Sequence, residues 1–398
     1  MILSLPRSLR GAIFWLHLTA ASIAGLAILI LCLSGAAMAF RDQALNWAER
    51  DVRHPGLPAG TTERLTFHEV LATASHSPAA GPISLVSIPK DPGEAIVLQT
   101  ADRKTWFVNP YSGEVRQAAA PRLEAFFLWM NRLHVRPPYG DGISAAANVV
   151  FVFLTLSGLY LWWPQTWSWS AVRPTIWFVS GARGRARDWN WHNVVAIWLL
   201  PILLVLGATG LVLSYASVNR LMFRLAGQPL PDPVAANQPV KPADKPVSPA
   251  PKLAVPPHDS PSLDDFMDQV EKRFPDWTRI VISIQPAMDP AKSGVKGFLS
   301  PQQLSAYVTR PHPWPVFAGT FVTRDVPTGE LRLKDSYATL GPGMRARRWV
   351  RLLHSGDAFG VPGQMVAGLA CLGGCLLVYT GYAMALRRLF KRIRPRAS

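Results

Sequence analysis

Charged residues are scarce in this sequence. They account for 17% of its 398 residues, while hydrophobic residues account for 49%. An ordinary soluble domain has about 25% charged residues. A chain so poor in charge cannot cover itself with the surface of a soluble globular protein. The composition therefore predicts a membrane protein before any motif is considered.

Cysteine is scarce as well. Cys32, Cys371 and Cys375 are the only three, and each lies within an apolar run. They do not form the disulfide framework of a small secreted domain, so we expect them to be packing residues. Because Cys371 and Cys375 are four residues apart, they would share one face of a helix, and a redox pair is the alternative interpretation.

Long apolar runs are abundant. A helix needs about 20 predominantly apolar residues to cross a bilayer. Four runs meet this requirement, at roughly residues 12–40, 143–164, 191–216 and 362–386. The first is too long for a cleaved signal peptide, and helix-like sequence continues after it. The fold class expected is a polytopic α-helical membrane protein with a four-helix transmembrane bundle.

Basic residues cluster at the N-terminus, in residues 165–190 and in the tail after the fourth run, where Asp188 is the only acid. The positive-inside rule places all three segments in the cytoplasm, so both termini are expected to be cytoplasmic in a bacterial inner membrane. The net charge of +16 is then mainly a signal of topology, and a nucleic-acid partner is not expected.

The chain then divides into seven parts. These are a cytoplasmic N-terminus with the first span (1–40), a periplasmic segment (41–140), the second span (141–164), a cytoplasmic loop (165–190), the third span (191–216), a second periplasmic segment (217–360), and the fourth span with its basic tail (361–398). Each periplasmic segment has a helix signal, strand-like runs and a hairpin, turning at Gly113 or Gly329, so we expect two small α+β domains. Residues 226–262 are Pro-rich and predict an extended linker.

The two halves of the chain repeat the same features. Each half has one histidine at the start of its first span and one in a Leu-His step before its second span; these are His17, His134, His192 and His354. Ser34-Gly35 and Thr209-Gly210 follow the first histidine of their half at the same interval. The second spans resemble each other around Gly158 and Gly381. The pattern predicts a parallel repeat about an axis along the membrane normal.

The predicted topology places the four histidines in two layers. His17 and His192 would form an inner pair near the cytoplasmic face, and His134 and His354 an outer pair near the periplasmic face. An ionisable side chain in a membrane bundle is a candidate functional residue. Two neutral imidazoles facing each other across a bundle favour bis-histidine ligation of haem iron. Arginines that could meet the haem propionates are Arg7, Arg10 and Arg187 on the inner side, and Arg132, Arg136, Arg348 and Arg351 on the outer side.

Other interpretations of these residues stay open. A single histidine near a membrane interface is usually a polar anchor, and glycine and serine are common packing residues in spans. Zinc or copper is disfavoured because no carboxylate or cysteine accompanies either pair. The remaining histidines are His54, His68, His76, His258 and His312, none with a partner in the repeat. Of these, His312 in "RPHPWP" is the candidate for a substrate contact.

Together, the four spans, the hairpins "VNPYSGEVR" and "VTRDVPTGELR", and the two Leu-His steps resemble the PepSY-associated transmembrane family, which includes iron-regulated membrane proteins and ferrisiderophore reductases. The resemblance covers nearly the whole chain, although the Pro-rich segment departs from it. It implies periplasmic PepSY domains and two b-type haems per chain. It would make His17, His134, His192 and His354 the haem ligands.

The resemblance also implies an oxidoreductase that passes electrons across the inner membrane to a periplasmic ferric siderophore in iron uptake. No GxGxxG motif follows a predicted strand, and the cytoplasmic segments are too short for a flavin or nicotinamide domain, so quinol or a separate cytoplasmic protein would be the donor. Two alternatives remain. One is a haem-free membrane scaffold whose PepSY domains bind or inhibit a periplasmic partner, and the other is a cytochrome serving another periplasmic redox enzyme.

Overall fold

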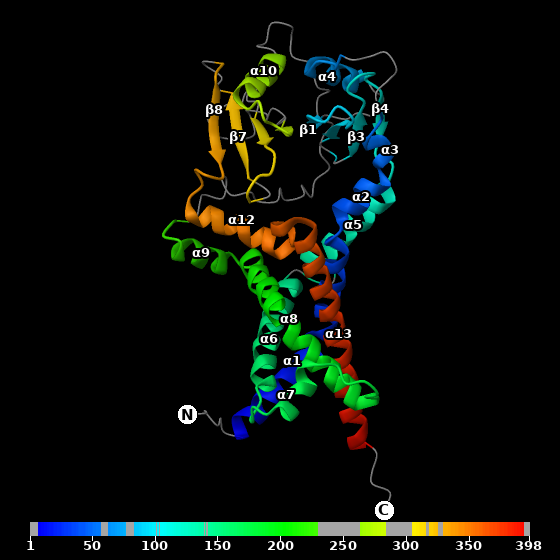
Figure 1. Cartoon of the computed structure of the whole chain (residues 1–398), viewed down its shortest axis with the longest axis vertical. Helices are drawn as coiled ribbons and strands as arrows, with labels where there is room; N and C mark the ends of the chain where they lie inside the picture. Colours follow the sequence, from blue (N-terminus) through cyan, green and yellow to red (C-terminus); the bar gives the residue numbers. More distant parts are fainter. Residues whose placement is uncertain are drawn as a thin grey trace, which may run out of the picture. The chain divides into compact units, whose positions relative to one another are not determined.

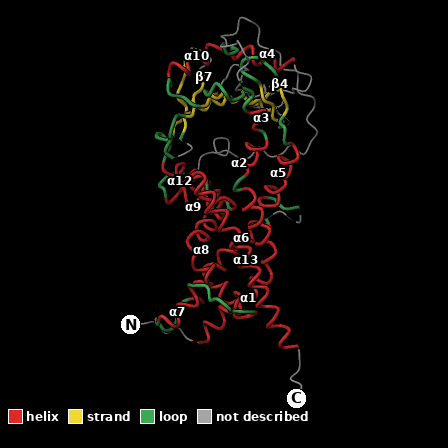
Figure 2. The backbone as a smooth tube through the Cα atoms, turned by 45° about the vertical axis from the view of Figure 1, so that its right-hand side comes forward, coloured by secondary structure: helices red, strands yellow, loops and turns green. Residues whose placement is uncertain are grey.

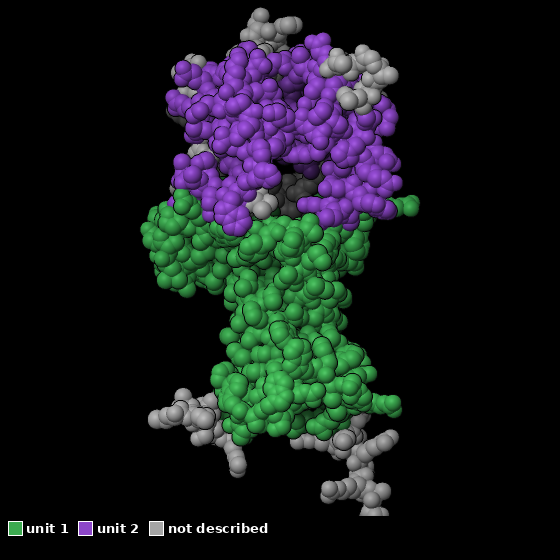
Figure 3. Space-filling view, viewed as in Figure 1, with its two compact units in different colours: residues 1–41, 122–230, 342–398 green, residues 42–121, 231–341 purple. Residues whose placement is uncertain are grey.

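The computed structural model describes residues 7–56, 63–76, 83–100, 102, 104–138, 140, 142–229, 263–283, 305–315, 318–324 and 329–393. The chain forms two compact units, coloured separately in Figure 3. The helical unit comprises Met1–Arg41, Arg122–Leu230 and Pro342–Ser398, and the sheet unit comprises Asp42–Pro121 and Pro231–Gly341. Most of the predicted linker, from residue 230 to residue 262, lies outside the described residues.

Every element described in the helical unit is a helix (Figures 1 and 2). In chain order they are α1 (Arg7–Met38), α5 (Pro121–Val135), α6 (Ile143–Trp162), α7 (Trp169–Ile176), α8 (Gly184–Ser214), α9 (Ala216–Leu225), α12 (Pro342–Ser355), the short 3-10 helix η1 (Asp357–Phe359) and α13 (Gly360–Ile393).

Four of these helices are long and apolar enough to cross a membrane: Leu9–Met38, Ile143–Trp162, Gly184–Ser214 and Asp357–Leu389. The predicted polytopic helical membrane protein is thereby confirmed. Helix α1 packs on α6 and α13, and α8 packs on the same two helices, which closes a bundle. Apolar side chains point outward from the bundle, as Ile23 does with 79% of its surface exposed. Such a surface suits hydrocarbon rather than water.

Small residues bring the spans close together. A Cβ atom added to Gly374 would lie 2.6 Å from the Cys32 sulfur, so only glycine fits between α13 and α1 at that point. Cys32 is buried in an apolar cluster with Ile28 and Ala147. All three cysteines are free thiols, and Cys32 contributes to helix packing as small apolar residues do.

Within its described residues, the sheet unit has four helices and eight strands. The helices are α2 (Arg41–Ala48), α3 (Arg50–Arg53), α4 (Phe67–His76) and α10 (Leu263–Arg273); the strands are β1 (Ile83–Pro89), β2 (Ile96–Thr100), β3 (Thr105–Val108), β4 (Val115–Gln117), β5 (Arg279–Ser283), β6 (Ser305–Thr309), β7 (Gly319–Arg324) and β8 (Leu331–Ser336). Gly113 and Gly329 have the positive φ that their predicted hairpin turns require.

The two outer segments share one sheet rather than forming two separate domains. The strand order is β4-β3-β2-β1-β5-β6-β7-β8, and β1 pairs antiparallel with β5, with Val86 opposite Ile282. One apolar core runs across this seam and includes Val70 of α4 and Phe266 of α10. Pairing β1 with β5 removes two edges that would otherwise expose unpaired backbone groups. The expectation of two small α+β domains did not include this pairing between their strands.

Candidate functional site

The outer pair of histidines meets inside the helical unit. His134 lies on α5 and His354 on α12, and their ring centroids are 6.1 Å apart with an interplanar angle of 61°. One metal ion bound by both rings, with nitrogen–metal distances of about 2 Å, would bring the centroids to about 6 Å. The separation of the two rings therefore fits a single ion between them.

The inner pair lies on the spans themselves. His17 is on α1 and His192 on α8. Both are partly buried, and they are close enough to interact electrostatically. His17 and Ser34 are on the same helix, and Ser34 contacts the outer His134. At 1.5 Å per residue, these two positions on α1 are about 25 Å apart. The two pairs thus occupy opposite ends of the bundle.

Each of the four histidines bonds to a hydroxyl on a neighbouring span. The Nδ1–Oγ distances are 2.8 Å for His17 and Ser157, 3.0 Å for His134 and Ser34, 2.9 Å for His192 and Thr380, and 3.1 Å for His354 and Thr209. The outer histidines have a second acceptor beside the same nitrogen, the carbonyl of Leu31 for His134 and of Leu206 for His354. Every ring is therefore fixed through Nδ1 by a helix other than its own.

The hydroxyl groups decide which ring nitrogen carries the proton. Each hydroxyl donates its one hydrogen to a carbonyl in the preceding turn of its helix: Ser34 to Ile30 at 2.6 Å, Ser157 to Leu154 at 3.3 Å, Thr209 to Val205 at 2.6 Å and Thr380 to Leu376 at 2.8 Å. Its oxygen is then left to accept a hydrogen bond from the histidine. The network assigns the proton to Nδ1 in all four rings, and Nε2 keeps the lone pair that binds a metal.

Burial keeps the outer rings neutral. It lowers the pKa of His134 to about 4, with the nearby His354 as a further cause, and it also lowers the pKa of His354. Both imidazoles are therefore unprotonated at neutral pH, which a metal ligand requires. Protonation of His134 or His354 would therefore require a pH below the ordinary pKa of histidine.

A glycine follows each hydroxyl residue, and three of these glycines lie beside a histidine ring, at a distance where an added Cβ would make ordinary van der Waals contact. A Cβ atom added to Gly35, Gly158 or Gly381 would lie 3.5 to 3.8 Å from the Cε1 atom of His134, His17 or His192, respectively. Gly210 differs, because its added Cβ would lie 2.7 Å from the Asn148 amide nitrogen. The histidine rings thus lie against three of the four glycines.

The role of the hydroxyl groups was missed in the sequence, although a signal was present. The same two-residue step, a hydroxyl residue followed by glycine, occurs once in each span: Ser34-Gly35, Ser157-Gly158, Thr209-Gly210 and Thr380-Gly381. Four histidines and four such steps could have been matched one to one. The sequence alone does not say which step meets which histidine, because that depends on how the spans pack.

The donor set of each pair fits haem iron. Among the described residues, no group of three or more His, Cys, Asp or Glu side chains comes together as a metal site, so each pair offers two imidazoles. Histidine imidazoles are common protein ligands of haem iron, so two imidazoles are a suitable donor set for it. If haem binds, His134 with His354 and His17 with His192 would hold it.

The arginines that were expected to meet the haem propionates differ in their contacts. Arg187 is bonded to Asp188 at 2.9 Å, and Arg387 of α13 lies 2.6 Å from the other oxygen of this fully buried carboxylate. Arg187 therefore already forms an ion pair with Asp188, and the sequence analysis did not predict this pair. Arg10 donates to the Leu161 carbonyl at 2.6 Å. On the outer side, Arg132, Arg136 and Arg351 are exposed, whereas the side chain of Arg7 lies outside the described residues.

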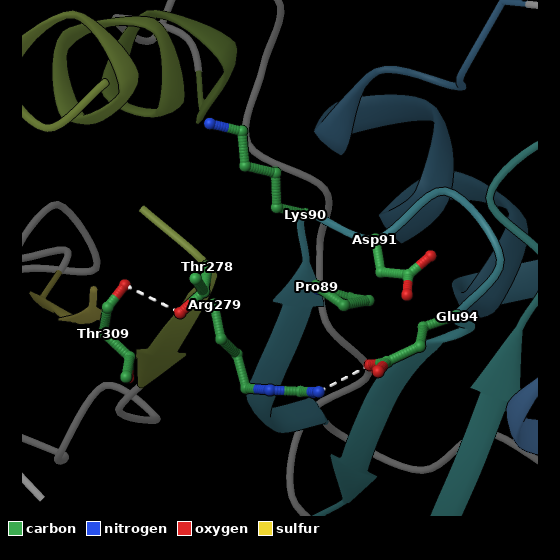
Figure 4. Close-up of a pocket in the computed structure, with 7 residues that line it drawn as sticks. All are labelled: Pro89, Lys90, Asp91, Glu94, Thr278, Arg279 and Thr309. Carbon is green, nitrogen blue, oxygen red and sulfur yellow. Dashed lines mark hydrogen bonds and ion pairs between the residues drawn. The ribbon is translucent and has the colours of Figure 1, made fainter. Parts of the chain in front are cut away.

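The sheet unit has a hollow of its own, of about 350 Å³. Figure 4 shows its lining, which comprises Pro89, Lys90, Asp91, Glu94, Thr278, Arg279 and Thr309. Arg279 is paired with Glu94 at 2.5 Å, and Lys90 donates to the Pro275 carbonyl at 2.7 Å. Both cations in the lining therefore already have partners within the protein. His312 is exposed in the segment between β6 and β7 and does not line it.

Comparison with protein families finds a match over nearly the whole chain. The family described as "PepSY-associated TM region" matches residues 14–388, a stretch that contains all four histidines and all four hydroxyl residues. Comparison with curated proteins finds no match.

Proposed function

The chain belongs to the family of the PepSY-associated transmembrane region, and from that premise we propose that it is a reductase of the bacterial inner membrane with two b-type haems. It would pass electrons across the bilayer to a periplasmic ferric chelate, such as a ferric siderophore. The observation that carries the proposal is the set of four histidines, each with Nδ1 bonded to a hydroxyl and each in one of two pairs.

The residues of the chain have a defined task in this proposal. When bound, haem would supply one-electron transfer at each end of the bundle. His17 and His192 would hold it at one end, and His134 and His354 at the other. The hydroxyl groups would keep each Nε2 unprotonated, because the proton is on Nδ1. They would also fix the orientation of each imidazole ring. The apolar spans around the pairs exclude water from them.

The orientation and the acceptor follow from chemistry. The basic residues of the loop 165–190 and of the C-terminal tail favour a cytoplasmic position, so the outer pair would lie at the periplasmic side. Quinol or a separate cytoplasmic protein is the proposed donor. Hard oxygen ligands hold ferric iron more strongly than ferrous iron, so reduction would release iron from the chelate and couple the protein to uptake.

The organisation of the chain supports the same proposal. Within residues 1–162 the two histidines bond to Ser34 and Ser157, and within residues 184–380 they bond to Thr209 and Thr380. The same helix-to-helix pattern in both halves supports a parallel two-fold repeat in the membrane. We propose that the two four-stranded halves of the sheet, β1–β4 and β5–β8, are the two PepSY modules.

The deciding experiment is a haem assay followed by reoxidation. Full-length protein purified from haem-replete cells should contain two b-type haems per chain in a pyridine haemochrome assay, both low-spin. The reduced protein should be reoxidised by ferric chelates in stopped-flow measurements. A well-folded preparation without haem would overturn the proposal in favour of the scaffold. Two haems without oxidation by any ferric chelate would favour a cytochrome that serves another redox enzyme.

A further inference from the structure

Helix α9 begins where a membrane span ends. Span α8 ends at Ser214, and α9 starts at Ala216, separated only by Tyr215, whose extended backbone has φ −118° and ψ 118°. Figure 1 shows α9 turning away from the line of α8. Because only one residue separates the two helices, α9 begins at the end of the span α8. If α8 crosses the bilayer, as its length and composition allow, α9 starts near the lipid headgroups on that side.

One side of α9 is held by α12. Phe223 is buried against Gly343, where an added Cβ atom would lie 2.5 Å from its ring. Asn219 accepts a hydrogen bond of 2.6 Å from Arg347. Gln228, just after α9, accepts from the backbone nitrogen of Gly343 at 2.9 Å. These contacts fix the rotation of α9 about its own axis.

The other sides of α9 have no protein against them in the described part of the chain. Leu221 and Leu225 are 53% and 80% exposed, and their spacing of four residues places them on one face of the helix. Arg220 and Arg224 are exposed as well and have the same spacing, so they lie on the adjoining face. The helix thus presents an apolar strip bordered by a cationic strip.

We propose that α9 binds anionic phospholipid in the leaflet at the Ser214 end of α8. Leu221 and Leu225 would enter the acyl chains, and Arg220 and Arg224 would bind the phosphates. An amphipathic helix with apolar residues on one face and arginines beside them binds membranes in this manner. The continuity of α9 with α8 argues for lipid rather than a soluble protein, because the bilayer surface is already at that level. The proposal does not depend on haem.

Two measurements on the full-length protein test the proposal. First, the photoreactive amino acid p-benzoylphenylalanine is placed at Leu225, and at the exposed Lys272 of α10 as the control. In vesicles of phosphatidylcholine with one-fifth phosphatidylglycerol, illumination should attach phospholipid at position 225 and not at position 272. A cross-linked dimer of the chain, or a peptide adduct in place of lipid at position 225, would overturn the proposal.

The second measurement counts the lipids that the protein retains. Arg220→Gln with Arg224→Gln is compared with Lys272→Gln with Arg273→Gln, which removes the same charge from exposed positions of the sheet unit. In native mass spectrometry, the ratio of retained phosphatidylglycerol to phosphatidylcholine should fall about fivefold for each arginine removed from α9. It should stay unchanged in the control. Equal ratios in the two double variants would contradict a role of α9 in binding anionic lipid.

Discussion

The two histidine pairs are fixed in different ways. The inner histidines, His17 and His192, are part of the spans that cross the membrane. The outer histidines, His134 and His354, lie on α5 and α12, which are not spans and have to fold back onto the bundle. Membrane insertion of α1 and α8 places the inner rings, whereas tertiary packing of amphipathic helices places the outer ones. We therefore expect the outer site to be the more sensitive to changes outside the bundle.

Removal of one ligand from each pair gives the largest expected effect. His354→Ala should lower the haem content from two to one per chain by loss of the outer haem, and His192→Ala should do the same by loss of the inner one. Spectroscopic redox titration of each variant identifies the haem that remains. His312→Ala, which changes an exposed histidine of the sheet unit, should keep both. Loss of the same haem in both ligand variants would show that the pairs are assigned wrongly.

Overpacking beneath α12 should separate the two sites. Gly343→Val places side-chain atoms where Phe223 lies, and forced overpacking costs about 1–3 kcal/mol. We expect α12 to shift and the outer haem to be lost severalfold faster, while the inner haem is retained. Haem transfer to apomyoglobin, followed by absorbance, measures both rates.

Gly11→Val is the control for this change. An added Cβ at Gly11 of α1 meets no atom within 4 Å, so both haems should be released at wild-type rates. If Gly343→Val released the inner haem as fast as the outer one, the two sites would not be independently supported.

Loss of one hydroxyl should matter more for His17 than for His134. Ser157 is the hydrogen-bond acceptor of His17, whereas His134 has the Leu31 carbonyl in addition to Ser34. Removing a group that orients a metal-ligating histidine costs about 10- to 100-fold in affinity. Ser157→Ala should therefore weaken the inner haem towards the upper end of this range, and Ser34→Ala should weaken the outer haem towards the lower end. Haem titration of the apoproteins gives both affinities, and the reverse order would contradict the role of the Leu31 carbonyl.

The smallest effect is expected at the contact between α9 and α12. Asn219→Ala removes the acceptor of Arg347, and one hydrogen bond contributes about 0.5–1.5 kcal/mol. The outer haem should then be released a few times faster, with no change at the inner haem. The same transfer assay resolves this difference when wild type and variant are measured side by side. An equal change at both haems would mean that α9 supports the whole bundle rather than α12.

Hydropathy was sufficient to predict the spans, and the repeated motifs led to the four histidines as candidate ligands. Apolar length determines whether a helix can cross a bilayer, so the four spans could be found from local sequence. The two hairpins could be found in the same way, from Gly113 and Gly329 at turns that need positive φ. Pairing in layers also brought together the histidines that the structure places near each other.

Long-range contacts could not be predicted. The pairing of β1 with β5 joins Val86 to Ile282, and no local pattern specifies a register between strands so far apart in the sequence. The pairing of Asp188 with Arg387 depends in the same way on how α8 packs on α13. The match between each histidine and its hydroxyl is set by packing of the spans, so the repeated hydroxyl-glycine steps showed only that four partners were present.

The distribution of the histidine contacts has a consequence for the order in which the protein is made. Each bond between a histidine and a hydroxyl joins residues of the same half of the chain, but each histidine pair joins one residue from each half. Once a ribosome has inserted residues 1–162, His17 and His134 already have the partners that orient them. At that stage His192 and His354, the second members of the two pairs, have not yet been translated. A nascent chain halted between α6 and α8 would hold two oriented imidazoles and no complete histidine pair, so the proposed haems could bind only at the end of synthesis.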